Sequence, residues 1–196
     1  MVNLKIAISG KARSGKNTIA TMLVNNLKND LSKEKIVALA DPIKLIVKTM
    51  FPEASDECLY GPSELRSHPI SDKYKDESGN ILTHRQALIE LGKRGRQYDN
   101  DLWLNILVQE ANRSKDINTY IIADVRYPNE FYYLKSHGFT MVRILRNDSA
   151  VINDSSETEQ DSIPNSDFDY IIYNNESLSE LNEKIALISG ELNRCE

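Results

Sequence analysis

The 196-residue sequence is poor in cysteine, in long apolar runs and in basic charge, and each shortage excludes a class of protein. Its two cysteines, Cys58 and Cys195, lie far apart without metal-ligand spacing, which argues against a disulfide framework or a zinc site. No apolar run approaches the length of a bilayer-spanning helix, and the short apolar N-terminal run has no small-residue cleavage site. We therefore expect reduced thiols, no membrane partner and a cytoplasmic location.

Basic residues are outnumbered, because 24 Lys and Arg against 29 Asp and Glu give a net charge of −5. The basic residues are also scattered, whereas proteins that follow a nucleic-acid backbone need a basic surface. We find neither an internal repeat nor a low-complexity tract. Hydrophobic residues still make up 40% of the chain, enough for a sizeable core. We therefore expect one globular domain over residues 1–196 and no nucleic-acid partner.

Short apolar runs alternate with helical patterns along the chain. Five runs are typical of strands buried on both faces: Leu4–Ser9, Ile36–Ala40, Tyr120–Ala123, Met141–Leu145 and Tyr170–Tyr173. The helical stretches are Thr18–Lys28, Pro42–Met50, Arg85–Arg94, Leu102–Arg113, Glu130–Ser136 and Leu178–Ile188. This alternation predicts an α/β fold in three layers, a five-stranded parallel sheet flanked by helices. Ligands of such folds gather at the carboxyl ends of the strands.

Residues 10–18 join the first expected strand to the first expected helix and have the spacing of a phosphate-binding P-loop. Two glycines permit backbone angles that turn successive amide N–H groups toward an anion at a helix N-terminus. Most P-loops place Ser or Thr directly after the lysine to ligate magnesium, whereas here Asn17 precedes Thr18. A glycine-rich turn that binds nothing is the alternative. We expect nine residues to bind nucleotide phosphates: Gly10, Lys11, Ala12, Arg13, Ser14, Gly15, Lys16, Asn17 and Thr18.

Charged residues follow or lie within other expected strands. Asp124 ends one of them, where P-loop enzymes keep a carboxylate that organises magnesium, and Arg126 follows two residues later. Phosphoryl transfer needs alignment, a metal and cations more than a strong base, and guanidinium groups bind phosphate oxygens in pairs. The alternatives are a helix cap at Asp124 and a salt-bridged sheet residue at Arg143. We expect catalytic roles for Lys16, Asp124, Arg126 and Arg143 (or Arg146), with Thr18 and Asp124 near the metal.

Residues that could hold a second, phosphorylated substrate lie mainly between residues 41 and 103. Asp41 follows an expected strand and opens a helix that contains Lys44, and residues 83–86 read as a capped helix start. Helix capping for Asp41 and an exposed helix face for the arginines remain alternatives. The substrate-binding candidates are Asp41, Lys44, Arg85, Arg96, Trp103 and Glu130.

Together these motifs resemble the phage-type deoxynucleoside monophosphate kinases, a branch of the P-loop kinases. The resemblance spans most of the chain, from residues 10–18 through Ala40–Pro42 and Thr83–Arg85 to Asp169–Ile172. Its most specific part is Asp124-Val125-Arg126-Tyr127-Pro128-Asn129-Glu130. Three motifs depart from the family pattern: Asn17 replaces Asp, His84 replaces Pro, and Gly92-Lys93-Arg94 replaces Gly-Thr-Asp.

The resemblance implies transfer of the γ-phosphoryl group of ATP to a deoxynucleoside 5′-monophosphate, with Mg2+, in the host cytoplasm if a phage encodes the chain. Arg85 and Arg96 would then anchor the acceptor phosphate, and Asp41, Trp103 and Glu130 would contact its base or sugar. Two stretches interrupt the alternation of strands and helices, residues 52–83 and 147–167. Because long loops of kinases often carry recognition, we expect an acceptor-binding insertion with a small helical cap over residues 52–113 and a lid or mobile loop over 147–167. A solvated loop is the alternative for both stretches, and a homodimer is left open.

Two other functions remain open on the sequence. One is a kinase of another small phosphorylated metabolite, such as phosphomevalonate or dephospho-coenzyme A, which would share the P-loop and differ in the cap. The other is a nucleotide-binding module without catalysis, which the replacement at Asn17 would favour.

Overall fold

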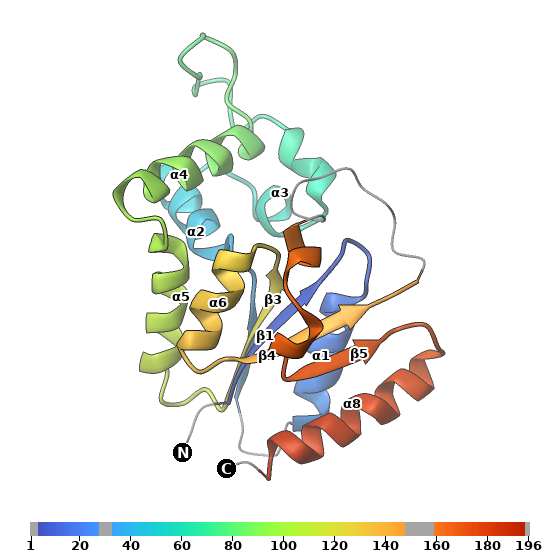
Figure 1. Cartoon of the computed structure of the whole chain (residues 1–196). Coiled ribbons are helices and arrows are strands. Elements are labelled where there is room, and N and C mark those ends of the chain that lie inside the picture. The colour runs from blue at the N-terminus through green and yellow to red at the C-terminus, as the bar shows by residue number, and fades with distance from the viewer. Residues whose placement is uncertain (1–3, 28–32, 148–158, 195–196) are drawn as a thin grey trace. The chain divides into compact units, whose positions relative to one another are not determined.

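The computed structural model describes residues 4–27, 33–147 and 159–194 (Figure 1). They form two compact units, which we call unit one (Met1–Leu39 and Leu107–Glu196) and unit two (Ala40–Ile106). Residues 148–158 of the predicted lid lie outside the described residues. The insertion over 52–113 stays a prediction, and the compact unit that overlaps it begins earlier in the chain, at Ala40.

Unit one contains a five-stranded parallel sheet in the order β2-β3-β1-β4-β5, which confirms the predicted α/β fold. The central strands are nearly continuous runs of buried residues, as strands covered on both faces require. The strands are β1 (Leu4–Gly10), β2 (Glu34–Val37), β3 (Thr119–Val125), β4 (Thr140–Leu145) and β5 (Tyr170–Tyr173).

Helices cover both faces of this sheet. On one face α1 (Lys16–Leu27) and α8 (Leu178–Leu192) lie side by side, and their apolar residues join a core with alternate residues of β1, β3 and β4 (Figure 1). On the other face α6 (Pro128–Ser136) packs beside β4, and α5 (Leu102–Arg113) meets β3 through the Tyr120 hydroxyl, which donates to Glu110. The three-layer prediction is therefore confirmed for unit one.

Several predicted boundaries were wrong by a few residues. The second strand was expected over 36–40 but ends at Val37, because the chain turns there and the Leu39 amide donates to Asp124. Helix α4 (His84–Tyr98) runs past Arg94 even though it contains Gly92 and Gly95, since tertiary packing outweighs their weak helix propensity. The short helix α3 (Asp56–Tyr60) was not predicted at all.

Unit two is helical and has its own core. It comprises α2 (Asp41–Met50), α3, the 3-10 turn η1 (Ser63–Ser67), α4 and the first residues of α5. Its core is a cluster of buried residues, Ile43, Val47, Ala54, Leu59, Ile70, Leu82, Ala87 and Trp103. No helix among the described residues of either unit has the length and apolar character that crossing a membrane requires.

The start of α4 explains one departure from the family pattern. The Thr83 hydroxyl accepts from the Gln86 amide, and the Gln86 side chain accepts from the Thr83 amide, so both ends of a capping box are present. The buried His84 accepts from the Ser55 amide at 3.0 Å and donates to the His68 carbonyl at 2.8 Å. Proline, with no side-chain donor or acceptor, could not make these bonds. His84 therefore ties two loop segments of unit two to the start of α4.

Candidate active site

The P-loop lies between β1 and α1 of unit one, where its backbone geometry requires glycine at two positions. Gly15 has a φ of +96°, and a Cβ there would lie 2.5 Å from the Asn174 amide nitrogen. A Cβ at Gly10 would lie 2.7 Å from Ser14 Oγ and 3.0 Å from the Ile144 carbonyl oxygen. Arg13 also has a left-handed φ, of 60°. The loop is therefore tightly wound and packed, as a cradle of inward-turned amides demands.

Lys16 begins α1 and folds back over the loop that precedes it. Its Nζ donates to the carbonyl oxygens of Gly10 and, at 2.8 Å, of Lys11. These carbonyls hold the ammonium group beside the loop, at the N-terminal end of the helix. An anion bound at this helix end would therefore meet both the helix dipole and a positioned cation.

Asn174, which directly follows β5, fixes the middle of the P-loop. Its Nδ2 donates to the Ser14 carbonyl at 2.8 Å, while the Ser14 hydroxyl is buried without a hydrogen-bond partner among the described residues. This bond fixes the orientation of the peptide group between Ser14 and Gly15. The N–H of Gly15 therefore points away from Asn174. Sequence reasoning missed this residue, because nothing in the pattern shows that the end of β5 touches the loop.

We expect Asn174→Ala to weaken ATP binding without unfolding the chain. Loss of one hydrogen bond costs about 1 kcal/mol, which corresponds to a rise of about fivefold in the Kd of ATP. Calorimetric titration with ATP would measure the change. The matched control is Asn175→Ala, because Asn175 accepts a bond from the Asn147 amide and not from the loop. An unchanged Kd in Asn174→Ala would contradict this role.

Asp124 lies near the carboxyl end of β3, the strand that pairs with β1. The register places Ser9 of β1 opposite Val125, so the carboxylate belongs to the same sheet edge as the P-loop. Its Oδ1 accepts from the Leu39 amide at 2.7 Å. Thr18, in the first turn of α1, is exposed. Magnesium bound with a nucleotide takes most of its ligands from phosphate and water, so one hydroxyl and one carboxylate suit it.

Glu130 and Arg126 meet at the start of α6. The Glu130 carboxylate accepts from the backbone amides of Arg126 at 2.8 Å and of Tyr127 at 3.0 Å. Burial raises the pKa of the Glu130 carboxyl, and these two bonds oppose that rise. Glu130 therefore caps α6 and fixes the backbone that carries Arg126, whose side chain is half-buried. Its predicted contact with the substrate stays a prediction.

Arg143 is buried in β4 and its guanidinium group bonds with the segment that precedes β5. Nη1 donates to the Ile163 carbonyl at 2.7 Å and to Asn165 Oδ1 at 2.9 Å, and Nη2 donates to the Gln160 carbonyl at 3.0 Å. To reach a phosphate, Arg143 would have to give up these bonds. The geometry favours the alternative of a partnered sheet residue, and direct phosphate contact stays a prediction.

The acceptor candidates of unit two are in different environments. Lys44 is buried, pairs with Asp41 at 2.8 Å and lies 5.0 Å from the centre of the Tyr60 ring. Arg85 donates to the Ser63 carbonyl at 2.7 Å. Asp41 and Lys44 are thus brought together, with Tyr60 as a neighbour that the sequence pattern did not identify.

The other two acceptor candidates, Arg96 on α4 and Trp103 on α5, differ in burial. Arg96 is exposed. Trp103 is buried, and its indole Nε1 donates to the Gly92 carbonyl at 3.0 Å. Its place among the core residues of unit two gives it a packing role, and its predicted contact with the acceptor stays a prediction.

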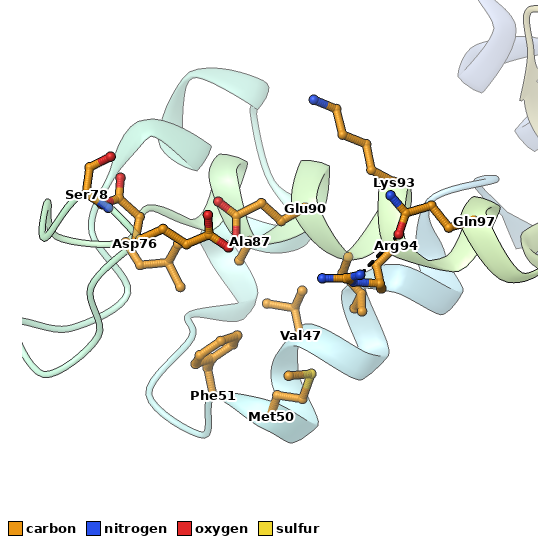
Figure 2. Close-up of a pocket in the computed structure, with 13 residues that line it drawn as sticks. Val47, Met50, Phe51, Asp76, Ser78, Ala87, Glu90, Lys93, Arg94 and Gln97 are labelled. Carbon is orange, nitrogen blue, oxygen red and sulfur yellow. Dashed lines mark hydrogen bonds between the residues drawn. The ribbon is translucent and has the colours of Figure 1, made fainter.

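Unit two also has a cavity of about 500 Å3 between α2, α4 and the turn at residues 76–78 (Figure 2). Val47, Met50 and Phe51 line its apolar side, and Glu90 and Arg94 are among its charged residues. None of the predicted acceptor residues lines this cavity. The acceptor candidates and this cavity are therefore different places in unit two.

Comparison with known proteins relates the chain to kinases. Residues 95–185 match the family model of deoxynucleotide monophosphate kinase, whereas no curated protein matches the sequence. A shikimate kinase from Aquifex aeolicus is 17% identical with a TM-score of 0.51, over 98% of this chain and 99% of that chain. An unliganded sugar kinase from Janibacter sp. HTCC2649 is 14% identical with a TM-score of 0.49, over 97% of this chain and 96% of that chain.

The first structural likeness establishes a shared fold and nothing finer, because identity is low. The matched residues contain the specific motif from Asp124 to Glu130, on which the resemblance in the sequence mainly rests. That resemblance is thus confirmed. The chain has the fold of the P-loop small-molecule kinases, and its residues 95–185 match the family model of deoxynucleotide monophosphate kinase.

Proposed function

We propose that this chain transfers the γ-phosphoryl group of ATP to the 5′-phosphate of a deoxynucleoside monophosphate, with magnesium. A kinase of this family uses ATP and takes a deoxynucleoside monophosphate as its substrate. The observation that carries the proposal for this chain is the arrangement of unit one. The P-loop cradle and the Lys16 ammonium lie at the same sheet edge as Asp124, which is near the carboxyl end of the neighbouring strand β3.

The proposed roles follow from chemistry and position. The loop amides and Lys16 bind the β- and γ-phosphates, and Arg126 neutralises charge that develops on the transferred group. Thr18 and Asp124 would hold magnesium, which would neutralise negative charge on the phosphates. The acceptor phosphate is already a nucleophile, so no residue has to remove a proton from it. The oxygen attacks the γ-phosphorus as the bond to the β-phosphate oxygen breaks, giving ADP and a deoxynucleoside diphosphate.

In unit two we propose that Arg85 and Arg96 bind the acceptor phosphate, and that Asp41 and Lys44 contact its sugar or base. The ion pair between Asp41 and Lys44 supports a polar contact of this kind, since the buried ammonium keeps its carboxylate partner in place. The positions of these residues at the start of α2 and on α4 give four polar side chains within one unit. We assign no phosphate contact to Trp103, whose indole is buried.

An acceptor panel tests the proposed function. The chain with ATP and magnesium would be offered the four deoxynucleoside monophosphates, the ribonucleoside monophosphates, phosphomevalonate and dephospho-coenzyme A, and ADP release would be measured. We expect release with one or more deoxynucleoside monophosphates. Release only with phosphomevalonate or dephospho-coenzyme A would identify a kinase of another metabolite. ATP binding without release on any acceptor would identify a non-catalytic nucleotide-binding module.

A further inference from the structure

Lys11, the first residue of the P-loop after Gly10, is held by a carboxylate from a distant part of unit one. Its Nζ lies 2.8 Å from Asp161 Oδ2, and the two side chains are 39% and 54% exposed. Asp161 belongs to the 3-10 turn η2 (Gln160–Ser162). The ammonium group of Lys11 is therefore already paired with a carboxylate of the protein, although it belongs to the loop that we propose binds phosphates.

The segment that carries Asp161 is anchored rather than loosely placed on the surface. Its neighbours Gln160 and Ile163 are 2% and 1% exposed, and their carbonyl oxygens accept from the Arg143 guanidinium group. The Arg143 group also lies 5.0 Å from the centre of the Phe168 ring. Arg143 thus holds the backbone on both sides of Asp161, which fixes where the carboxylate is presented.

Arg143 also offers Asp161 a second counter-ion. Its Nη2 lies 3.8 Å from Asp161 Oδ1, whereas Lys11 pairs with the other carboxylate oxygen, Oδ2. The carboxylate therefore lies between two cations, a partly exposed one on the P-loop and a buried one in β4. If Lys11 moved away, the charge of Asp161 would still be partnered.

We propose that Asp161 is a positioning residue that competes with the nucleotide phosphates for Lys11, and so weakens nucleotide binding and speeds nucleotide release. This inference rests on the proposed function, because it assumes that the P-loop binds ATP. An exposed ion pair contributes about 0–1 kcal/mol, so a triphosphate can displace the carboxylate. Removal of Asp161 then leaves Lys11 available to the phosphates and removes a repelling charge. If the ion pair only stabilised the loop, its loss would loosen the loop and weaken nucleotide binding instead of strengthening it.

Asp161→Asn tests the competition, because the amide has nearly the shape of the carboxylate without its charge. We expect the Kd of ATP with magnesium, measured by calorimetry on the full chain, to fall by about two- to fivefold, the change that an exposed ion pair of up to about 1 kcal/mol allows. The difference should shrink as salt is raised, because salt screens exposed charges. Asp161→Glu, which keeps the charge, should restore the Kd toward that of the wild type. In the transfer assay Asp161→Asn should lower the KM of ATP without raising kcat.

Two further variants separate competition from other effects. Lys11→Met removes the contested ammonium, so Asp161→Asn should change the Kd far less in that background. Asp167→Asn is the matched control, because Asp167 lies in the same segment and accepts from the Tyr132 hydroxyl instead. It should leave the Kd unchanged.

The proposal is overturned if Asp161→Asn binds ATP as the wild type does or more weakly, or if its effect is undiminished in Lys11→Met. Binding needs no acceptor, so its outcome is separate from the acceptor panel. A chain that binds ATP in this pattern but phosphorylates no acceptor would fail only the proposed function. A wild-type chain without affinity for ATP would overturn both.

Discussion

Lys16→Ala should lower kcat by about 10²- to 10³-fold while leaving the KM of the acceptor nearly unchanged. The expected size is that of removing one preorganised donor from developing transition-state charge. The physical basis is the position of the Lys16 ammonium, held over the P-loop by the carbonyl oxygens of Gly10 and Lys11. A cation placed there stabilises charge as it spreads over the γ-phosphate, whereas the acceptor candidates lie on other elements. Steady-state ADP release at varied acceptor concentration would separate kcat from KM.

Two controls keep this result interpretable. Lys33→Ala removes an exposed lysine that pairs with Asp116 at 3.5 Å, so it should leave kcat unchanged. Lys16→Met keeps the length of the side chain without the charge and should resemble Lys16→Ala, while thermal unfolding shows that both variants are folded. Turnover by both Lys16 variants equal to that of the wild type would refute the role of this residue.

Trp103→Ala should lower the free energy of unfolding by about 3–5 kcal/mol, a large part of the 5–15 kcal/mol typical of a domain. The indole is buried in the core of unit two, and its Nε1 donates to the Gly92 carbonyl. It also packs so closely on α4 that a Cβ at Gly95 would lie 2.2 Å from its ring. Gly95→Ala should therefore be destabilising too, by about 1–3 kcal/mol. Denaturant unfolding followed by circular dichroism would measure both changes.

Trp103→Phe distinguishes packing from substrate contact. It keeps an aromatic ring but loses the bond to Gly92, so we expect a loss of about 1 kcal/mol in stability and little change in the KM of the acceptor. A raised acceptor KM at unchanged stability would instead support the substrate contact that the sequence predicted. Tyr98→Ala, at the end of α4, is the control, because Tyr98 is 81% exposed and should change stability by less than about 0.5 kcal/mol.

The sequence was sufficient for features that depend on nearest neighbours along the chain. The alternation of apolar runs and helical stretches predicted the five parallel strands, because strands buried on both faces need nearly continuous apolar residues. The glycine spacing predicted the P-loop, because Gly15 needs a positive φ there. The motif from Asp124 to Glu130 indicated the family whose model residues 95–185 match.

The boundaries that were wrong depended on contacts made elsewhere. The Leu39 amide bonds to Asp124 in another strand, which the local sequence 36–40 does not reveal. Gly92 and Gly95 are poor helix formers, but Gly95 leaves room for the indole that packs on α4, and the Gly92 carbonyl accepts from that indole. Such long-range contacts outweigh propensities of about 1 kcal/mol per residue.

The tertiary structure alone decided which charged side chains are available and which already have partners. Residue type indicated that Arg143 and Glu130 could serve phosphate chemistry, yet one bonds with residues 160–165 and the other caps α6. Conversely, Asn174 and Asp161 showed no sequence signal, and only the folded chain brings them to the P-loop. The reason is physical: spacing along the chain specifies local backbone conformation, whereas a buried or paired charge is set by residues far away in sequence.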